Sequence, residues 1–171
     1  MKVKILILFL FFCSIINSQT TPEIYIETYK DLAIKEMYRT GIPAAVTLAQ
    51  GFVESGFGNS YLAKKANNHF GIKCKSNWKG EKIFYQDDDA DNCFRKYKTV
   101  EDSYKDHSNF LKTRIHYKFL FQLDPLDYQS WCYGLKKAGY STNPNYAKQL
   151  IDCTEKYNLN EYSKCPTLQE N

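Results

Sequence analysis

In one stretch of the chain, which begins at Pro43, a helical pattern of apolar residues stops abruptly, and this limits the folds that the chain can form. Apolar residues recur at helical spacing after Pro43, which suits a first helical turn, and the pattern stops at Glu54. Gly56 and Gly58 follow, as is typical where a helix ends and the chain turns. The sequence therefore predicts a buried helix that carries Glu54 at its C-terminal end.

Glu54 has the position that a general acid needs. A carboxylate at a helix C-terminus lies at the negative end of the macrodipole, which raises its pKa. A carboxylic acid that stays protonated near neutral pH can protonate a leaving group. The alternative is a solvated glutamate at a helix end, because most acidic side chains are exposed. The segments that follow Glu54 favour the catalytic interpretation.

Length and composition indicate one packed domain. The chain has 171 residues, of which 43% are hydrophobic and 25% charged, so a globular core is expected and wholesale disorder is not. The net charge of +4 is small and dispersed, which argues against nucleic acid as a partner. Aromatic residues make up 16% of the chain, and this content weakly favours a surface that binds sugars or proteins.

Residues 1–18 have the features of a secretory signal peptide. A short basic start precedes an apolar run over residues 5–12, and this run is too short to span a membrane. Phe12 occupies the position where a lipoprotein signal has a small residue, so we expect no lipidation of Cys13. We expect the mature protein to be a monomer without a stable membrane anchor, in the periplasm or secreted.

Export permits disulfide bonds, and five of the six cysteines follow the leader. Cys74 and Cys93 flank a predicted hairpin, which favours a bridge between them. Cys132 is expected to pair with Cys153 or Cys165, and the spacing does not choose between them. A zinc site is disfavoured because the chain has no close Cys-x-x-Cys pair and its histidines are scattered. We therefore expect neither a metal nor a cofactor.

The mature chain predicts a mainly helical α+β domain over residues 22–159, followed by a polar, loose tail over residues 160–171. Asn59 and Thr99 are the predicted caps of the helices that follow them. Helices are predicted over residues 22–39, 43–54, 59–65, 117–122 and 146–157, and from residues 100 and 127 onward.

A small β-lobe interrupts these helices. Strand propensity over residues 82–85 and 93–97 predicts a hairpin, with Asp87, Asp88 and Asp89 at its tip. A solvated tip or a weak Ca²⁺ site are the alternatives for these acids. A glutamate on one wall of a cleft and a carboxylate on the other is the arrangement of glycosidases. We therefore expect the hairpin lobe to lie across a cleft from Glu54.

The ordered segments together resemble the glucosaminidase domain, glycoside hydrolase family 73, which includes the flagellar peptidoglycan hydrolase and secreted bacterial autolysins. The resemblance runs from about residue 42 to 159, and its order and spacing are more specific than any one block. The matching blocks are Ala49-Gln50, Glu54-Ser55-Gly56-Phe57-Gly58, Asn68-His69-Phe70-Gly71-Ile72-Lys73, Trp78-Lys79-Gly80, Phe94-Arg95-Lys96-Tyr97 and Ala138-Gly139-Tyr140-Ser141-Thr142-Asn143-Pro144-Asn145-Tyr146-Ala147.

This resemblance implies a lysozyme-like fold with a small β-hairpin lobe across a substrate cleft. It implies an endo-beta-N-acetylglucosaminidase that acts on peptidoglycan glycan strands and cleaves the β-1,4 bond after N-acetylglucosamine. Glu54 falls on the general acid of the family. The second carboxylate is expected at the hairpin tip, with Asp88 and Asp89 as the leading candidates and Asp87 behind them.

Other site residues follow from the same blocks. Tyr140 falls on a tyrosine of the family's cleft that positions substrate or water, and a core tyrosine is its alternative. The candidate substrate-binding residues are Asn68, Phe70, Trp78 and Tyr146. Packing under the β-lobe is the alternative for Phe70 and Trp78.

The sequence leaves three other functions as alternatives. A lytic transglycosylase shares the single catalytic glutamate but makes an anhydro product, and the block around Tyr140 favours the hydrolase. A non-catalytic cell-wall-binding module would keep the cleft without the chemistry, which the presence of Glu54 disfavours. A secreted adhesin would explain the cysteines and tyrosines but not the ordered blocks.

Overall fold

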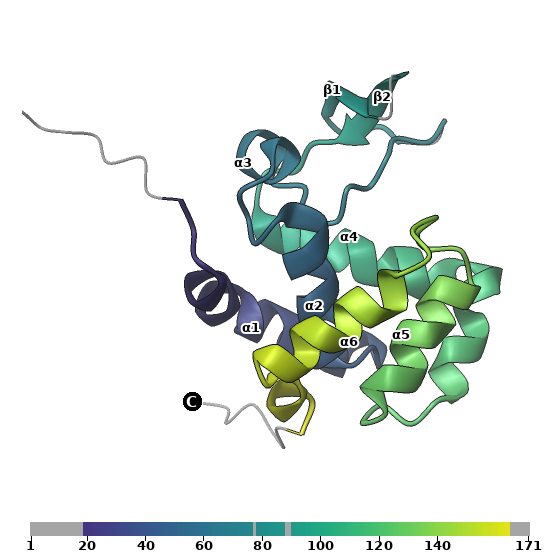
Figure 1. Cartoon of the computed structure of the whole chain (residues 1–171). Helices are drawn as coiled ribbons and strands as arrows, with labels where there is room; N and C mark the ends of the chain where they lie inside the picture. Colours follow the sequence, from purple (N-terminus) through teal and green to yellow (C-terminus); the bar gives the residue numbers. More distant parts are fainter. Residues whose placement is uncertain (1–18, 77, 88–89, 165–171) are drawn as a thin grey trace, which may run out of the picture.

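The computed structural model describes residues 19–164, except for residues 77, 88 and 89, so the predicted signal peptide lies outside the described residues. The fold is mainly helical, and a two-stranded antiparallel sheet lies between α3 and α4 in the chain (Figure 1). The elements are α1 (Pro22–Thr40), α2 (Ala44–Ser55), α3 (Tyr61–Ala66), β1 (Lys82–Asp87), β2 (Ala90–Arg95), α4 (Val100–Thr113), the 3-10 helix η1 (Ile115–Gln122), α5 (Tyr128–Lys137), α6 (Tyr146–Lys156) and the 3-10 helix η2 (Leu159–Ser163).

Helix α2 is the central element of the fold. Its residues 44–51 are all buried, and so is Ser55. Helices α1 and α6 and the 3-10 helix η2 pack around it, and α4 and α5 contact it as well. A helix that is apolar all round belongs in the interior of a protein. The C-terminal end of α2 leads toward α3 and the hairpin (Figure 1).

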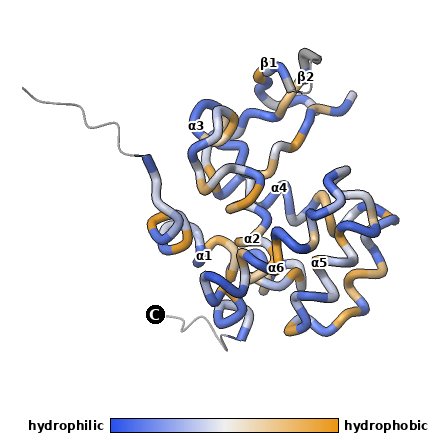
Figure 2. Tube along the Cα trace, viewed as in Figure 1, coloured by the Kyte–Doolittle hydropathy of each residue, from blue (hydrophilic) through white to orange (hydrophobic). Residues whose placement is uncertain are grey.

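The helices around α2 are amphipathic, and each carries hydrophobic and hydrophilic residues along its length (Figure 2). On α6, for example, Leu150 and Ile151 are buried, whereas Lys148 and Asp152 form an exposed ion pair at 2.7 Å. In the part of the chain that the structure describes, none of the helices has the length and hydropathy of a membrane span.

The hairpin lobe is held to the preceding segment by a disulfide bond. Every residue of β1 pairs with one of β2, and the preceding chain adds a single bridge between Lys73 and Phe94. Cys74 and Cys93 form the predicted disulfide, and the Cys74 amide also donates to the Cys93 carbonyl at 2.8 Å. Residues 73–75 are therefore fixed against β2.

The cap of α4 agrees with the prediction, whereas the cap of α3 does not. Thr99 caps α4 in a reciprocal capping box. Helix α3 is capped by Ser60, whose hydroxyl accepts from the Ala63 amide at 3.2 Å. Asn59, the predicted cap, instead donates its side-chain amide to the Thr20 carbonyl at 2.8 Å. Its side chain therefore ties the start of the described chain to the turn after α2.

The prediction of a loose tail from residue 160 is wrong for its first part. The 3-10 helix η2 contacts α2, and its Leu159 is completely buried. The hydroxyl of Ser163 accepts a hydrogen bond from the Ala45 amide at 2.9 Å. This bond satisfies a first-turn amide of α2, which has no side-chain cap at Pro43. The remaining residues of the predicted tail, 165–171, lie outside the described residues.

The predicted bridge from Cys132 to Cys153 is not formed. Both residues are free thiols, and both are buried on α5 and α6, which pack against each other. A free cysteine in such a contact behaves as a small apolar side chain, so packing accounts for both positions. The other predicted partner, Cys165, lies outside the described residues.

We expect Gly51→Val to destabilise the fold. A Cβ atom at this position would lie 2.7 Å from the Tyr25 hydroxyl and 2.9 Å from the Tyr104 hydroxyl. These hydroxyls hydrogen-bond to each other at 3.1 Å, and Tyr25 also bonds to His69 at 3.0 Å, so neither ring can move without breaking the network. Urea denaturation should show a loss of about 2 kcal/mol or more in the free energy of unfolding, within the range for overpacked cores.

A double variant provides the control for this prediction. Tyr25→Phe removes the hydroxyl nearest to the new side chain, so part of the overpacking is relieved. The double variant Gly51→Val/Tyr25→Phe should therefore lose less stability than the sum of the two single variants. Strictly additive losses would contradict the proposed clash.

Candidate active site

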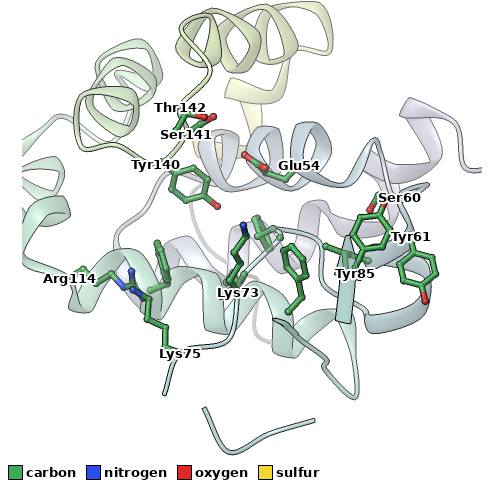
Figure 3. Close-up of a pocket in the computed structure, with 16 residues that line it drawn as sticks. Glu54, Ser60, Tyr61, Lys73, Lys75, Tyr85, Arg114, Tyr140, Ser141 and Thr142 are labelled. Carbon is green, nitrogen blue, oxygen red and sulfur yellow. The ribbon is translucent and has the colours of Figure 1, made fainter. Parts of the chain in front are cut away.

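A cavity of about 660 Å³ lies at the C-terminal end of α2, between the helices and the hairpin lobe. The predicted acid Glu54 is on one wall, and residues of the hairpin lobe are on another, which agrees with the expected cleft (Figure 3). The lining residues are Glu54, Ser60, Tyr61, Leu62, Phe70, Gly71, Ile72, Lys73, Lys75, Tyr85, Phe94, Phe110, Arg114, Tyr140, Ser141 and Thr142.

The turn after Glu54 is built by the two residues that follow it. Gly56 ends α2 with a left-handed φ of 54°, a conformation that favours glycine. The buried hydroxyl of Ser55 donates to the Gly51 carbonyl at 2.6 Å and accepts from the Gly58 amide at 2.8 Å. The chain therefore leaves α2 sharply, and Glu54 remains at the rim of the cavity.

Burial raises the pKa of Glu54 above its ordinary value, and a hydrogen bond with the Tyr146 side chain acts in the opposite direction. The direction agrees with the prediction from the sequence. The cause of the raised pKa differs from the prediction. Burial is the largest contribution, whereas the prediction relied on the negative end of the helix dipole. The protonated form, which a general acid needs, is thereby favoured at higher pH than for an exposed glutamate.

Two tyrosines support Glu54 from the C-terminal block. Tyr146 is buried on α6, and its hydroxyl accepts from the side-chain amide of Gln50 at 3.0 Å. Gln50 and Glu54 lie one helical turn apart on α2, so Tyr146 bridges this turn to α6. Tyr140 stacks on Tyr146, with ring centroids 5.6 Å apart and planes at 13°. It lines the cavity, and Figure 3 shows Glu54 reaching toward it.

Tyr140 is a hydrogen-bond donor at the cavity wall. Burial raises the pKa of its hydroxyl well above the ordinary value, and the charge of Glu54 acts in the same direction. The hydroxyl therefore stays protonated. This agrees with a role in positioning a substrate or water oxygen, which was predicted for Tyr140.

A pair of tyrosines that the sequence did not single out forms another part of the wall. Tyr61 of α3 and Tyr85 of β1 are stacked, with centroids 5.0 Å apart and planes at 17°. Both line the cavity and are 46% and 41% exposed, so their rings are accessible to a ligand. The two rings belong to a helix and a strand that are separate in the sequence. Strand alternation could have indicated which way Tyr85 faces, but no sequence signal indicated its contact with Tyr61.

Three basic side chains also line the cavity: Lys73, Lys75 and Arg114. Lys73 and Lys75 flank the disulfide-bonded Cys74, and Lys73 lies 5.5 Å from the centroid of the Phe94 ring. The Arg114 guanidinium lies 3.6 Å from the centroid of the Phe110 ring. The low net charge of the chain did not indicate this cluster of basic residues, because residues 73–75 and Arg114 are far apart in the sequence and meet only in the fold.

Two of the predicted substrate-binding residues are packing residues. Asn68 is buried and does not line the cavity: its amide donates to the carbonyls of Ile72 and Arg95, and its oxygen accepts from the Ile72 amide. Phe70 lines the cavity but is only 3% exposed, because its ring stacks on His107 at 3.9 Å. Asn68 therefore positions the loop at Gly71, and Phe70 forms the floor of the cavity.

Trp78 lies away from the cleft. It lines a separate cavity of about 320 Å³, and its indole N–H donates to the Glu81 carbonyl at 2.9 Å. The Arg95 guanidinium lies 4.5 Å from the centroid of the indole ring. Trp78 therefore does not line the cavity that contains Glu54, and its contacts favour the packing alternative for this residue.

The predicted second carboxylate falls where the structure gives no side chain. Asp88 and Asp89 lie outside the described residues, and of Asp87 only the backbone, at the end of β1, is described. Among the described residues that line the cavity, Glu54 is the single carboxylate. The same part of the chain contains no group of three or more His, Cys, Asp or Glu side chains placed to hold a metal ion.

Comparison with known proteins gives a family match over most of the chain. A family model described as Glucosaminidase, mannosyl-glycoprotein endo-beta-N-acetylglucosaminidase, matches residues 30–159. The exo-glucosaminidase LytG of Bacillus subtilis is 34% identical over 131 residues, which cover 70% of this chain and 46% of LytG. The peptidoglycan hydrolase FlgJ of Vibrio parahaemolyticus is 30% identical over 147 residues, which cover 80% of this chain and 47% of that FlgJ. The chain thus spans about half the length of these relatives.

Solved structures share the fold. The catalytic domain of the autolysin Auto from Listeria monocytogenes superposes with a TM-score of 0.70 at 25% identity, covering 87% of this chain and 91% of that one. The glycoside hydrolase domain of FlgJ from Salmonella typhimurium also gives a TM-score of 0.70, at 23% identity, and the match covers 81% of this chain and 89% of that domain. The predicted lysozyme-like α+β fold is therefore confirmed.

We expect Tyr146→Phe to raise the pKa of Glu54. The hydrogen bond with Tyr146 lowers this pKa, so its loss leaves the effect of burial unopposed. The measurement is a titration of the Glu54 carboxyl carbon by NMR. Tyr128→Phe is the matched control, because its hydroxyl contacts the exposed Glu155 at 3.3 Å and does not touch Glu54. A Glu54 pKa that is unchanged or lower in Tyr146→Phe would contradict the bridge to Tyr146.

Proposed function

Because the chain belongs to the glucosaminidase family of glycoside hydrolases, we propose that it is an exported peptidoglycan hydrolase. It cleaves the β-1,4 bond after N-acetylglucosamine in peptidoglycan glycan strands. Its relatives, named as an exo-glucosaminidase and a peptidoglycan hydrolase, support this substrate class. We propose endo cleavage, in line with the description of the matching family model.

The observation that carries this proposal is the position of Glu54. It is the one carboxylate among the described lining residues of the cleft, and its pKa is raised by burial. An acid of this kind donates its proton to the glycosidic oxygen as the bond breaks. Tyr140 lies on the adjacent wall and donates a hydrogen bond to substrate or water.

The second carboxylate comes from the tip of the hairpin. Asp88 and Asp89 are the first candidates and Asp87 is the next. All three follow closely after Tyr85, which β1 places in the wall of the cleft. Such a carboxylate assists the attacking water or stabilises the oxocarbenium-like transition state. Single Asp→Asn variants at the three positions identify it by the largest loss of kcat.

A lytic transglycosylase is the second candidate. Such an enzyme uses one glutamate and forms an anhydro-muramic product without water, and Glu54 in the cleft could take this role. A wall-binding module without catalysis is disfavoured by the raised pKa of Glu54, which binding does not need. The products of digestion separate these alternatives.

The remaining proposals concern the form of the protein in the cell. We propose that residues 1–18 act as a signal peptide, that residues 22–164 form the catalytic domain, and that the mature protein is a periplasmic or secreted monomer. The helix η2 extends the predicted domain beyond residue 159 because it packs on α2.

We expect Tyr85→Ala to raise KM for glycan strands with a smaller effect on kcat. The stacked rings of Tyr61 and Tyr85 offer an apolar face for a sugar away from the reacting bond. Phe84→Ala is the matched control, because Phe84 is the neighbouring aromatic on the same strand, is 67% exposed and does not line the cavity. Equal effects of the two variants on KM would contradict a sugar platform at Tyr85.

The central experiment is a digest of purified peptidoglycan with the mature protein and with Glu54→Gln. The products are reduced with borohydride and identified by mass spectrometry. We expect reducible N-acetylglucosamine ends from the wild type, and a loss of at least about 100-fold in rate for the variant, the lower range for general acid catalysis.

Other outcomes have distinct meanings. Anhydro-muramic ends would identify a transglycosylase, and no release by the folded wild type would favour a binding module. Activity that survives in Glu54→Gln would show that another residue is the acid. Early appearance of long fragments indicates endo cleavage, whereas steady release of single end units indicates exo cleavage.

A further inference from the structure

The cleft has a basic wall that the proposed chemistry does not use. Lys73, Lys75 and Arg114 line the same cavity as Glu54. Among the residues whose side chains the structure describes, which do not include residues 87–91 of the hairpin, no carboxylate lies within ion-pair distance of Lys75 or Arg114. A neutral sugar offers no negative charge to pair with Lys75 and Arg114. This wall of the cavity is therefore complementary to a ligand group that carries negative charge.

The fold fixes the backbone beside Lys75 and the side chain of Arg114. Lys75 follows Cys74, whose disulfide and backbone hydrogen bond with Cys93 fix the segment to the hairpin. Arg114 stands between α4 and η1, and its guanidinium packs on Phe110. Figure 3 draws Lys75 and Arg114 on the side of the cavity away from Tyr61 and Tyr85, with Glu54 and Tyr140 between the two groups in the view.

We infer that Lys75 and Arg114 select substrates by binding a carboxylate of the peptidoglycan strand, an inference that rests on the proposed function. A guanidinium presents paired donors that match a carboxylate, and an ammonium adds a point charge. Peptidoglycan offers two sources of this group: the carboxylates of its peptide stem, and the lactyl carboxylate of muramic acid, which is an amide in stem-bearing strands and is free only where the stem has been removed. The neutral oligomers of N-acetylglucosamine in chitin offer neither.

The rival explanation is that these cations only pack against the wall. Arg114 contacts Phe110, and such a contact contributes to stability with or without a ligand. Packing, however, predicts the same loss for charged and neutral substrates. Selection of a carboxylate predicts a loss for charged substrates alone.

The test compares the double variant Lys75→Gln/Arg114→Gln with Lys65→Gln/Lys118→Gln. The control removes the same charge from two exposed lysines that do not line the cavity. Kinetics are measured on stem-bearing strands, on strands stripped of stems by an amidase, which frees the lactyl carboxylate, and on chitin oligomers. Thermal unfolding of both double variants checks their folds.

We expect KM for stem-bearing strands to rise about tenfold or more in the cleft variant, as the loss of a charge-assisted hydrogen bond predicts, and to stay near the wild-type value in the control. A rise confined to stem-bearing strands identifies the stem carboxylates as the bound group, a rise confined to stripped strands identifies the freed lactyl carboxylate, and a rise on both shows that the two cations accept either carboxylate. An equal rise on chitin oligomers, or the same KM as the control on all charged strands, would overturn the inference.

A binding measurement separates this inference from the proposed function. Sedimentation of Glu54→Gln protein with insoluble peptidoglycan and with chitin needs no catalysis. Addition of the two cleft substitutions should abolish any preference for peptidoglycan, and addition of the two control substitutions should not. If the wild type cleaves nothing, the proposed function fails, yet this comparison still decides whether the cations bind the carboxylate.

Discussion

Helix α2 is packed on every side, and the position of the candidate acid depends on this packing. Helices α1 and α6 and the 3-10 helix η2 surround it, so its axis is fixed relative to the rest of the domain. The helix must end where the cavity begins, and the turn at Gly56 with the two hydrogen bonds of Ser55 achieves this. Glu54 is thereby held at the one end of a buried helix that reaches the surface.

The same packing sets the chemistry of the carboxyl group. Burial favours the protonated form of Glu54, while the Tyr146 side chain moderates the effect. Tyr146 is in turn held by Gln50, one turn before Glu54 on α2. The predicted substrate-binding residue Tyr146 does not line the cavity but contacts Glu54, and Tyr140, stacked on it, lines the cavity. The C-terminal block therefore serves both the acid and the cleft.

Features that depend on neighbours along the chain could be predicted. Helical periodicity and two glycines located the end of α2, the Thr99 cap located α4, and hairpin geometry paired Cys74 with Cys93. Adjacent residues of similar type could not be told apart, because Asn59 and Ser60 are both good caps and only Ser60 acts as one.

Features that depend on contacts between distant segments were missed or misjudged. The stack of Tyr61 on Tyr85 joins a helix to a strand, and the basic wall combines residues 73–75 with Arg114. Likewise, sequence spacing suggested a bridge at Cys132, whereas tertiary packing buries it as a free thiol. The signal for such features lies in the packing of elements, which periodicity does not encode.

If burial makes Glu54 the general acid of the cleft, activity must follow the ionisation of this carboxyl group. Two curves for the wild-type protein decide this: kcat/KM for glycan cleavage against pH, and the titration of the Glu54 carboxyl carbon by NMR. We predict that activity falls with rising pH along the Glu54 titration, at a pKa above the ordinary value for glutamate. A Glu54 that titrates at the ordinary value, or activity that falls at a different pH, would contradict the account.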